Sequence, residues 1–106
     1  MACKVIVPDK WVDEFERFVA RLEKATQGKM IRYIDLMESR GPLLPMPFAR
    51  KLSEDIWELR MRGKQEVRFL YTFNRNQVFI VSWFVKKSQK TPLKELRKAK
   101  NRALNI

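Results

Sequence analysis

The chain has 106 residues, enough for a single domain over residues 1–106 whose core forms without disulfides or metals. Its 23 Lys and Arg against 12 Asp and Glu give a formal net charge of +11, which favours a polyanionic partner such as nucleic acid, an acidic protein or an anionic membrane surface. One cysteine and no histidine exclude an internal disulfide and a nuclease built on paired histidines, and they give no support to a zinc site.

The first half of the chain predicts a strand followed by two helices. Residues 4–7 form a short β-branched stretch that is typical of an edge strand. Asp9 is placed to cap a first helix, whose apolar face is Trp11, Phe15, Phe18 and Leu22. A second helix is expected over about residues 29–38, separated from the first by Gly28, so that the two form an antiparallel hairpin. Residues 41–47 then contain a glycine that stops this helix and three prolines that favour an extended connector.

The second half changes to the alternation that is typical of strands. Three runs, residues 56–62, 66–73 and 77–85, are separated by short turn sequences and predict a three-stranded antiparallel meander. Thr91 is placed to cap a final helix with Pro92 at its first position. The expected class is therefore α+β, with a short N-terminal strand, a helical hairpin, the meander and a C-terminal helix, and with the helices on one face of the sheet.

No segment predicts secretion or a membrane span. The N-terminus lacks the long apolar core of a signal peptide. The longest apolar-rich run, residues 78–85, is interrupted by Ser82 and is too short to span a bilayer. Since Cys3 is the only cysteine, a reducing compartment and a cytoplasmic location are expected.

Alternation also predicts a charged face on the sheet. The even positions from 58 to 62 are charged, and Arg68 on the next strand falls on the same face as Arg60. Lys86 and Lys87 arrive at the end of the third strand, so two arginines and two lysines surround one concavity suited to phosphate. The alternative is a solvated sheet face on which the four residues Glu58, Arg60, Glu66 and Arg68 form cross-strand salt bridges.

Cleavage of an RNA phosphodiester is the sharper interpretation of this face. Arginine offers a planar fork to phosphate oxygens and stabilises charge on a pentacoordinate phosphorus, and RNA supplies its own nucleophile in the 2′-hydroxyl. Without histidine, proton transfer falls to Glu58, to a lysine whose pKa is depressed by like charges, or to the phosphate itself. No dinucleotide-binding, Walker or serine-hydrolase motif is present to support other chemistry.

Three motifs in the second half carry a family resemblance. The chain has IWELR at residues 56–60, VRFLY at 67–71 and FVKKSQKTP at 84–92, followed by a basic helix. These motifs, in this order, resemble the HigB branch of the RelE/ParE toxin superfamily, including its phage-derived members. The resemblance covers residues 42–106 well, and over the first 40 residues only the order of elements agrees.

The resemblance implies the toxin of a type II toxin–antitoxin pair. Such a toxin is an mRNA interferase that cuts messages in the ribosomal A site by 2′-hydroxyl attack, leaves a 2′,3′-cyclic phosphate and needs no metal or other cofactor. A helix-turn-helix antitoxin is the implied protein partner. Two alternatives stay open: a ParE-like inhibitor of DNA gyrase, which would not need the basic set, and a non-catalytic module that binds RNA or ribosomes.

The resemblance also implies roles for individual residues. Arg68 matches the arginine that contacts the scissile phosphate, and Arg60 and Lys87 match the other two basic positions of the family's site. Glu58 is the candidate for proton transfer or for orienting Arg60. The expected RNA-binding residues are Lys86, Lys90, Arg62 and Lys64. Some superfamily members have a tyrosine or histidine where this chain has Ser88, Gln89 and Pro92, so the group that moves the proton stays open.

Overall fold

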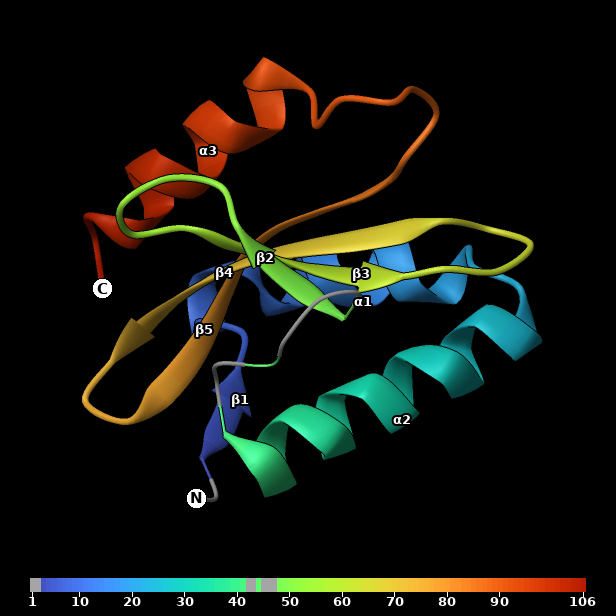
Figure 1. Ribbon diagram of the computed structural model, residues 1–106, viewed down its shortest axis with the longest axis horizontal. Coiled ribbons are helices and arrows are strands. Elements are labelled where there is room, and N and C mark those ends of the chain that lie inside the picture. The colour runs from blue at the N-terminus through green and yellow to red at the C-terminus, as the bar shows by residue number, and fades with distance from the viewer. Residues whose placement is uncertain (1–2, 42–43, 45–47) are drawn as a thin grey trace.

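A mixed five-stranded sheet lies at the centre of the molecule (Figure 1). The computed structural model describes residues 3–41, 44 and 48–106. Its strands are β1 (Lys4–Ile6), β2 (Ala49–Lys51), β3 (Trp57–Met61), β4 (Val67–Asn74) and β5 (Gln77–Val85). Its helices are the 3-10 turn η1 (Asp9–Trp11), α1 (Val12–Ala20), α2 (Lys24–Arg40) and α3 (Leu93–Ala103). The predicted α+β class is confirmed.

The sheet contains the predicted meander and two short flanking strands. In the order β1-β5-β4-β3-β2, the three central strands pair antiparallel as the alternation predicts. Strand β1 pairs parallel to β5 at one edge, so the predicted edge strand is confirmed. Strand β2, which pairs antiparallel with β3, was not predicted. It follows the proline-rich connector, of which residues 42–43 and 45–47 lie outside the described residues.

The boundary between the first two helices differs from the prediction. Helix α2 begins at Lys24, and Gly28 lies inside it, so Gly28 does not separate the helices. The separation falls at residues 21–23, where Glu23 is extended and its backbone N–H donates to Oε1 of Gln65 at 2.8 Å. A contact with a distant residue therefore fixes this boundary. The predicted stop at Gly41 is confirmed, and its φ of 97° explains why glycine ends the helix there.

Both predicted N-caps are wrong. Asp9 lies in η1, and the residue that precedes α1, Trp11, makes no side-chain capping bond. Pro92 precedes α3 instead of being its first residue, and it also makes no such bond. The hydroxyl of Thr91 donates instead to Oε2 of Glu58 at 2.7 Å. A hydrogen bond to a carboxylate is stronger than one between two neutral groups.

The sheet is covered on both faces, so the expectation of helices on one face is wrong. Helices α1 and α2 pack on the face of Leu59 and Phe69, in the larger apolar cluster. Helix α3 packs on the opposite face, where Ala99 joins a second cluster with Leu70 (Figure 1). Neighbouring residues of β4 therefore enter two different cores, which makes β4 a central strand buried on both sides.

Candidate functional site

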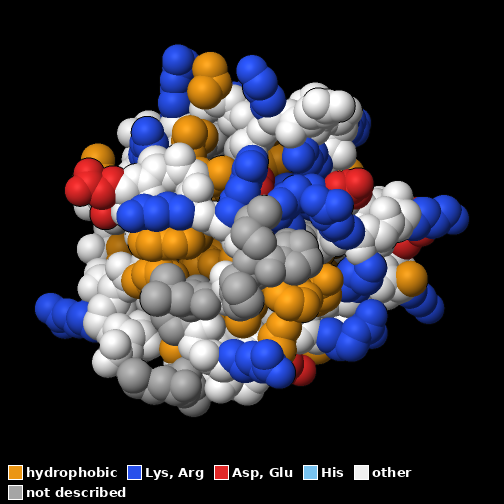
Figure 2. Space-filling model, in the orientation of Figure 1, with side chains coloured by type: hydrophobic (Ala, Val, Ile, Leu, Met, Phe, Trp, Pro, Cys, Tyr) orange, Lys and Arg blue, Asp and Glu red, His pale blue; other side chains and the backbone are white. Residues whose placement is uncertain are grey.

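A basic pocket opens where the ends of β3 and β4 meet the chain that leaves β5. Its volume is about 620 Å³, and its lining is Arg60, Arg62, Glu66, Arg68, Lys86, Lys87, Ser88 and Gln89. The structure thus brings together five of the predicted site residues, all of them cationic. Glu66 supplies the one carboxylate in the lining. In the space-filling view, Lys and Arg side chains gather near the middle of the molecule, where few acidic side chains are visible (Figure 2). The pocket is suited to a polyanion.

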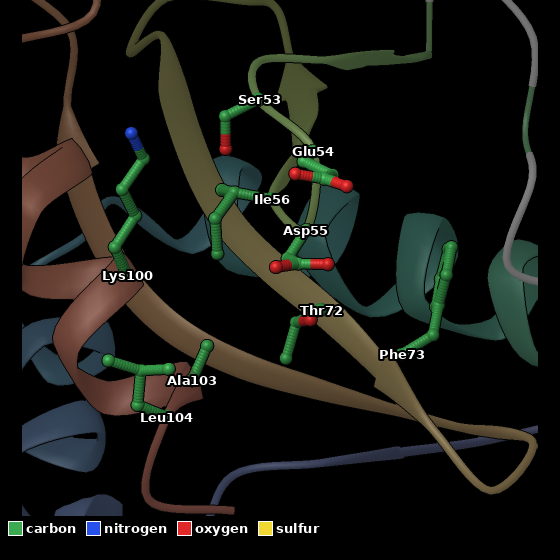
Figure 3. Close-up of a pocket in the computed structure, with 9 residues that line it drawn as sticks. All are labelled: Ser53, Glu54, Asp55, Ile56, Thr72, Phe73, Lys100, Ala103 and Leu104. Atoms are coloured by element: carbon green, nitrogen blue, oxygen red, sulfur yellow. The ribbon is translucent and has the colours of Figure 1, made fainter.

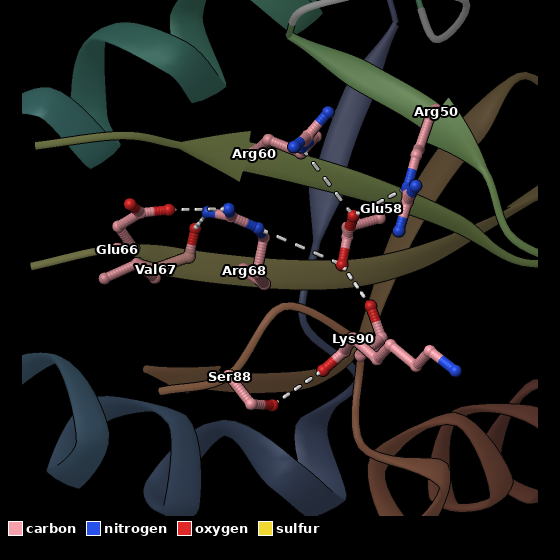
Figure 4. A network of polar contacts seen from close by, with 9 residues as sticks. Arg50, Glu58, Arg60, Glu66, Val67, Arg68, Ser88 and Lys90 are labelled. Atoms are coloured by element: carbon pink, nitrogen blue, oxygen red, sulfur yellow. Dashed lines mark hydrogen bonds and ion pairs between the residues drawn. The ribbon is translucent and has the colours of Figure 1, made fainter. Parts of the chain in front are cut away.

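Glu58 lies beneath this pocket and does not line it. Its side chain is completely buried. Oε1 lies 3.2 Å from Nε of Arg50 and 3.9 Å from Nε of Arg60, and Oε2 accepts the hydrogen bond from Thr91 and lies 4.0 Å from Nε of Arg68 (Figure 4). Of the two roles considered for Glu58, the geometry is compatible with orienting the arginines. A carboxylate enclosed in this way does not reach a 2′-hydroxyl in the pocket.

Arg68 is a buried cation and not part of a solvated face. Its side chain is 1% exposed. Nη2 donates to Oε1 of Glu66 at 2.8 Å, and Nη1 donates to the carbonyl oxygen of Val67 at 3.1 Å. Its Nε is buried and has no hydrogen-bond partner among the described residues. The alternative of exposed cross-strand salt bridges does not fit this geometry, because both Arg68 and Glu58 are removed from solvent.

Crowding of like charges changes the acid–base behaviour of the pocket. Burial lowers the pKa of Arg60, and the neighbouring Arg62 and Arg68 lower it further. Burial and then the charge of Arg68 lower the pKa of Lys86. The hydrogen bond from Arg68 lowers the pKa of Glu66. The Nε of Arg60 is also buried without a hydrogen-bond partner in the described part of the chain. An anion in this pocket would compensate the crowded cations.

Two predicted RNA-binding residues lie outside the pocket. Lys64 has a side chain that is 83% exposed, and its ammonium lies 3.9 Å from the carboxylate of Glu23. Lys90 is exposed, and its backbone carbonyl accepts a hydrogen bond from Ser88. Sequence reasoning missed Arg50, because it lies on the unpredicted strand β2. It also gave Thr91 a capping role, and no local signal pointed to Glu58 as its partner.

A second pocket of about 470 Å³ lies between the start of β3 and the end of α3 (Figure 3). It is lined by Ser53, Glu54, Asp55, Ile56, Thr72, Phe73, Lys100, Ala103 and Leu104. Two carboxylates and one ammonium give it no excess of positive charge. This second pocket is therefore less suited to a polyanion than the basic pocket.

Two further searches cover residues 3–41, 44 and 48–106. No helix in these residues is long and apolar enough to cross a membrane. Within the same residues, no three side chains of His, Cys, Asp or Glu come together in a group that could hold a metal ion.

Comparisons with known proteins agree with this architecture. A family model described as phage derived protein Gp49-like (DUF891) matches residues 17–104. Among solved structures, the chain is similar to a double arginine-to-alanine mutant of the E. coli toxin RelE in the free state, with a TM-score of 0.65 and 15% identity over 96% of this chain and 98% of that chain. At this identity the likeness shows the fold. No curated protein matches the chain significantly. The chain therefore belongs to the Gp49-like family of phage-derived proteins, and it has a RelE-like fold, as the resemblance implies.

Proposed function

We propose that this protein is the toxin of a type II toxin–antitoxin pair and an endoribonuclease that cleaves mRNA on the ribosome. The observation that carries the proposal is the basic pocket, in which Arg60 and Arg68 keep buried guanidinium nitrogens without hydrogen-bond partners among the described residues. The pocket is lined by five cationic side chains and one carboxylate, so an anionic ligand offsets the excess of positive charge. The family and the fold support the same assignment.

In the proposed reaction the RNA supplies the nucleophile. The 2′-hydroxyl oxygen attacks the adjacent phosphorus as Lys86, whose pKa is lowered, accepts its proton. Arg60 and the buried Arg68 stabilise the charge that develops on the phosphate oxygens. The bond from phosphorus to the 5′-oxygen breaks, Lys87 donates a proton to that oxygen, and a 2′,3′-cyclic phosphate remains. Glu58 takes no proton and holds the arginines in place.

Side chains supply the positive charge in this mechanism, so it does not require a divalent metal. This can be tested with a short RNA in place of ribosomes, because ribosomes themselves need Mg²⁺. At high enzyme concentration, cleavage of that RNA is expected to persist in excess chelator. Arg62 is exposed at the mouth of the pocket and contacts a flanking phosphate. The proposed protein partner is a helix-turn-helix antitoxin that silences the toxin.

The test combines induced expression with mapping of RNA ends. Wild-type protein should arrest growth and cut messages at A-site codons, leaving 2′,3′-cyclic phosphate ends. Arg60→Ala should lower the single-turnover cleavage rate about 10²- to 10³-fold, as loss of a transition-state donor does. Arg32→Ala is the matched control, since it removes an exposed arginine from α2 on the other side of the sheet.

Other outcomes would assign the protein differently. Growth arrest with DNA damage and intact messages would indicate a gyrase inhibitor. A folded protein that binds RNA without cleavage or arrest would indicate a binding module. Arg68→Ala is a weaker probe than Arg60→Ala, because removal of a side chain that is 1% exposed also disturbs folding.

A further inference from the structure

Four separate segments of the chain converge on the buried carboxylate of Glu58. Arg50 comes from β2, Arg60 from β3, Arg68 from β4, and Thr91 from the connection between β5 and α3. Three of these groups are cations and therefore balance the charge of Glu58. Thr91 is neutral, yet its contact of 2.7 Å is the shortest of the four. Its role is therefore not charge compensation.

The hydroxyl of Thr91 fixes one end of a segment that forms a wall of the basic pocket. Residues 86–89 of this connection line the pocket. At the other end of the segment, the backbone N–H of Lys86 donates to the carbonyl oxygen of Glu66 at 2.7 Å. Lys86 and Lys87 thus lie between two anchors, the backbone of Glu66 just before β4 and the carboxylate of Glu58. If the bond to Glu58 were lost, only the backbone bond to Glu66 would hold the two lysines near the arginines.

Helix α3 is attached to the sheet independently of Thr91. The hydroxyl of Ser82 donates to Oε1 of Glu95 at 2.6 Å, and Nη1 of Arg102 donates to the carbonyl oxygen of Val81 on β5 at 3.3 Å. Ala99 is fully buried in the cluster under α3. Removal of the Thr91 hydroxyl therefore loosens the connection and leaves the helix in place.

We infer that Thr91 is a positioning residue for RNA cleavage. Through its hydrogen bond to Glu58, it holds the 86–91 connection so that Lys86 and Lys87 face the phosphate bound by Arg60. The inference rests on the proposed function. This hydroxyl is directed to the carboxylate and makes no capping bond at α3, whose N-cap residue is Pro92.

Three variants test this role. Thr91→Val removes the hydroxyl at nearly constant shape, and Thr91→Ser keeps it. Thr72→Val is the matched control, because Thr72 is a buried threonine on β4 that lines the other pocket. Loss of a hydrogen bond to a charged group should lower kcat about tenfold in Thr91→Val, and Thr91→Ser should restore it.

Binding measurements separate positioning from charge. Thr91→Val keeps every cation, so the salt dependence of its binding to a 2′-O-methyl RNA, which cannot be cleaved, should equal that of the wild type. With a cleavable RNA, the KM of Thr91→Val should differ from the wild-type KM by less than about twofold. Lys87→Ala should reduce the slope of that dependence by about 0.7. Amide hydrogen exchange should become faster over residues 86–91 in Thr91→Val and stay unchanged in α3.

Each failure has its own signature. If the wild type cleaves RNA and Thr91→Val matches Thr72→Val in kcat and in hydrogen exchange, the inference is wrong and the proposed function stands. If Thr91→Val melts well below the control and Thr91→Ser does not restore kcat, Thr91 is structural and the inference is wrong. If the wild type cleaves no RNA, the proposed function fails and the inference fails with it.

Discussion

One face of the sheet has two halves with opposite chemistry. Under α3, Ile56 and Leu70 are completely buried and form a dry apolar cluster with Ala99. Two residues after Ile56 and two residues before Leu70, the same face carries Glu58 and Arg68, which are equally buried but charged. Helix α3 begins only at Leu93 and covers the first half, and the basic pocket occupies the second. A difference of two residues along each strand therefore separates a core from a site.

The two halves contribute differently to stability. Apolar burial stabilises the first half by about 25 cal/mol for each Å² removed from water. Burial of charge in the second half costs free energy unless each cation finds an anion, and the pocket has more cations than carboxylates. Stability is therefore expected to be concentrated under α3, while the charged half carries the proposed RNA site. The four changes below test this division.

Glu58→Gln should have the largest effect, because it breaks the charged half at its centre. Three arginines would lose their shared anion, and one of them, Arg68, is fully buried, so the free energy of unfolding should fall by about 4 kcal/mol. Urea denaturation measures this change. Inorganic phosphate should stabilise the variant more than the wild type, since an external anion can replace the missing charge. Equal stability with and without the substitution would show that Glu58 is not the counter-ion.

Leu70→Ala tests the apolar half in the same assay. Leu70 is completely buried under α3, so the lost burial and the cavity should lower the free energy of unfolding by about 3 kcal/mol. The cleavage rate per folded molecule should stay close to that of the wild type. Phosphate should give this variant no extra protection. A strong loss of activity in the folded fraction would mean that the two halves are coupled.

Lys86 tests whether the charged half moves a proton. Burial and Arg68 lower its pKa, so a larger fraction is neutral at a given pH than for an ordinary lysine. A base acts in its deprotonated form, so the cleavage rate should rise about tenfold per pH unit below that pKa and level off above it. Lys86→Arg keeps the charge but cannot deprotonate, and it should remove this slope. The same pH profile in Lys86→Arg would assign the proton to another group.

The sequence alone predicted the parts of the fold that depend on local pattern. Alternation along β3 and β4 correctly placed Arg60 and Arg68 on one face, and Gly41 correctly marked a helix end. Strand β2 could not be predicted because three residues are too few to show alternation. The start of α2 depends on Gln65, which is 42 residues away from Glu23, so no local signal specified it.

The site could be predicted only in its outline. The pattern assigned Glu58 to the outer face, and nothing in it indicated that the connection after β5 closes over that carboxylate through Thr91. The pattern also showed an apolar side on α3 without showing which face of the sheet it covers. The β4–β5 ladder has an irregularity between Leu70 and Tyr71. Such a bulge adds a residue to one strand, and the apolar run of β5 gives no sign of it.

Glu66→Gln should have the smallest effect of the four changes. It tests the outer edge of the charged half, at the mouth of the basic pocket. Glu66 is half-exposed at the pocket mouth, and its carboxylate competes with a phosphate for Nη2 of Arg68. Loss of that negative charge should tighten RNA binding about two- to threefold at neutral pH, since an exposed pair contributes little. Glu54→Gln, an exposed carboxylate beside the other pocket, is the control.

The melting temperatures of the wild type and of Glu66→Gln should depend differently on pH. The hydrogen bond from Arg68 lowers the folded-state pKa of Glu66 below its ordinary value of 4.5. A depressed carboxyl pKa contributes stability above that ordinary value, and the contribution is lost as the pH falls through the folded-state pKa. Wild type and Glu66→Gln should therefore differ in melting temperature at pH 7 and converge in acid. A difference that persists in acid would show that Glu66 acts through packing and not through its charge.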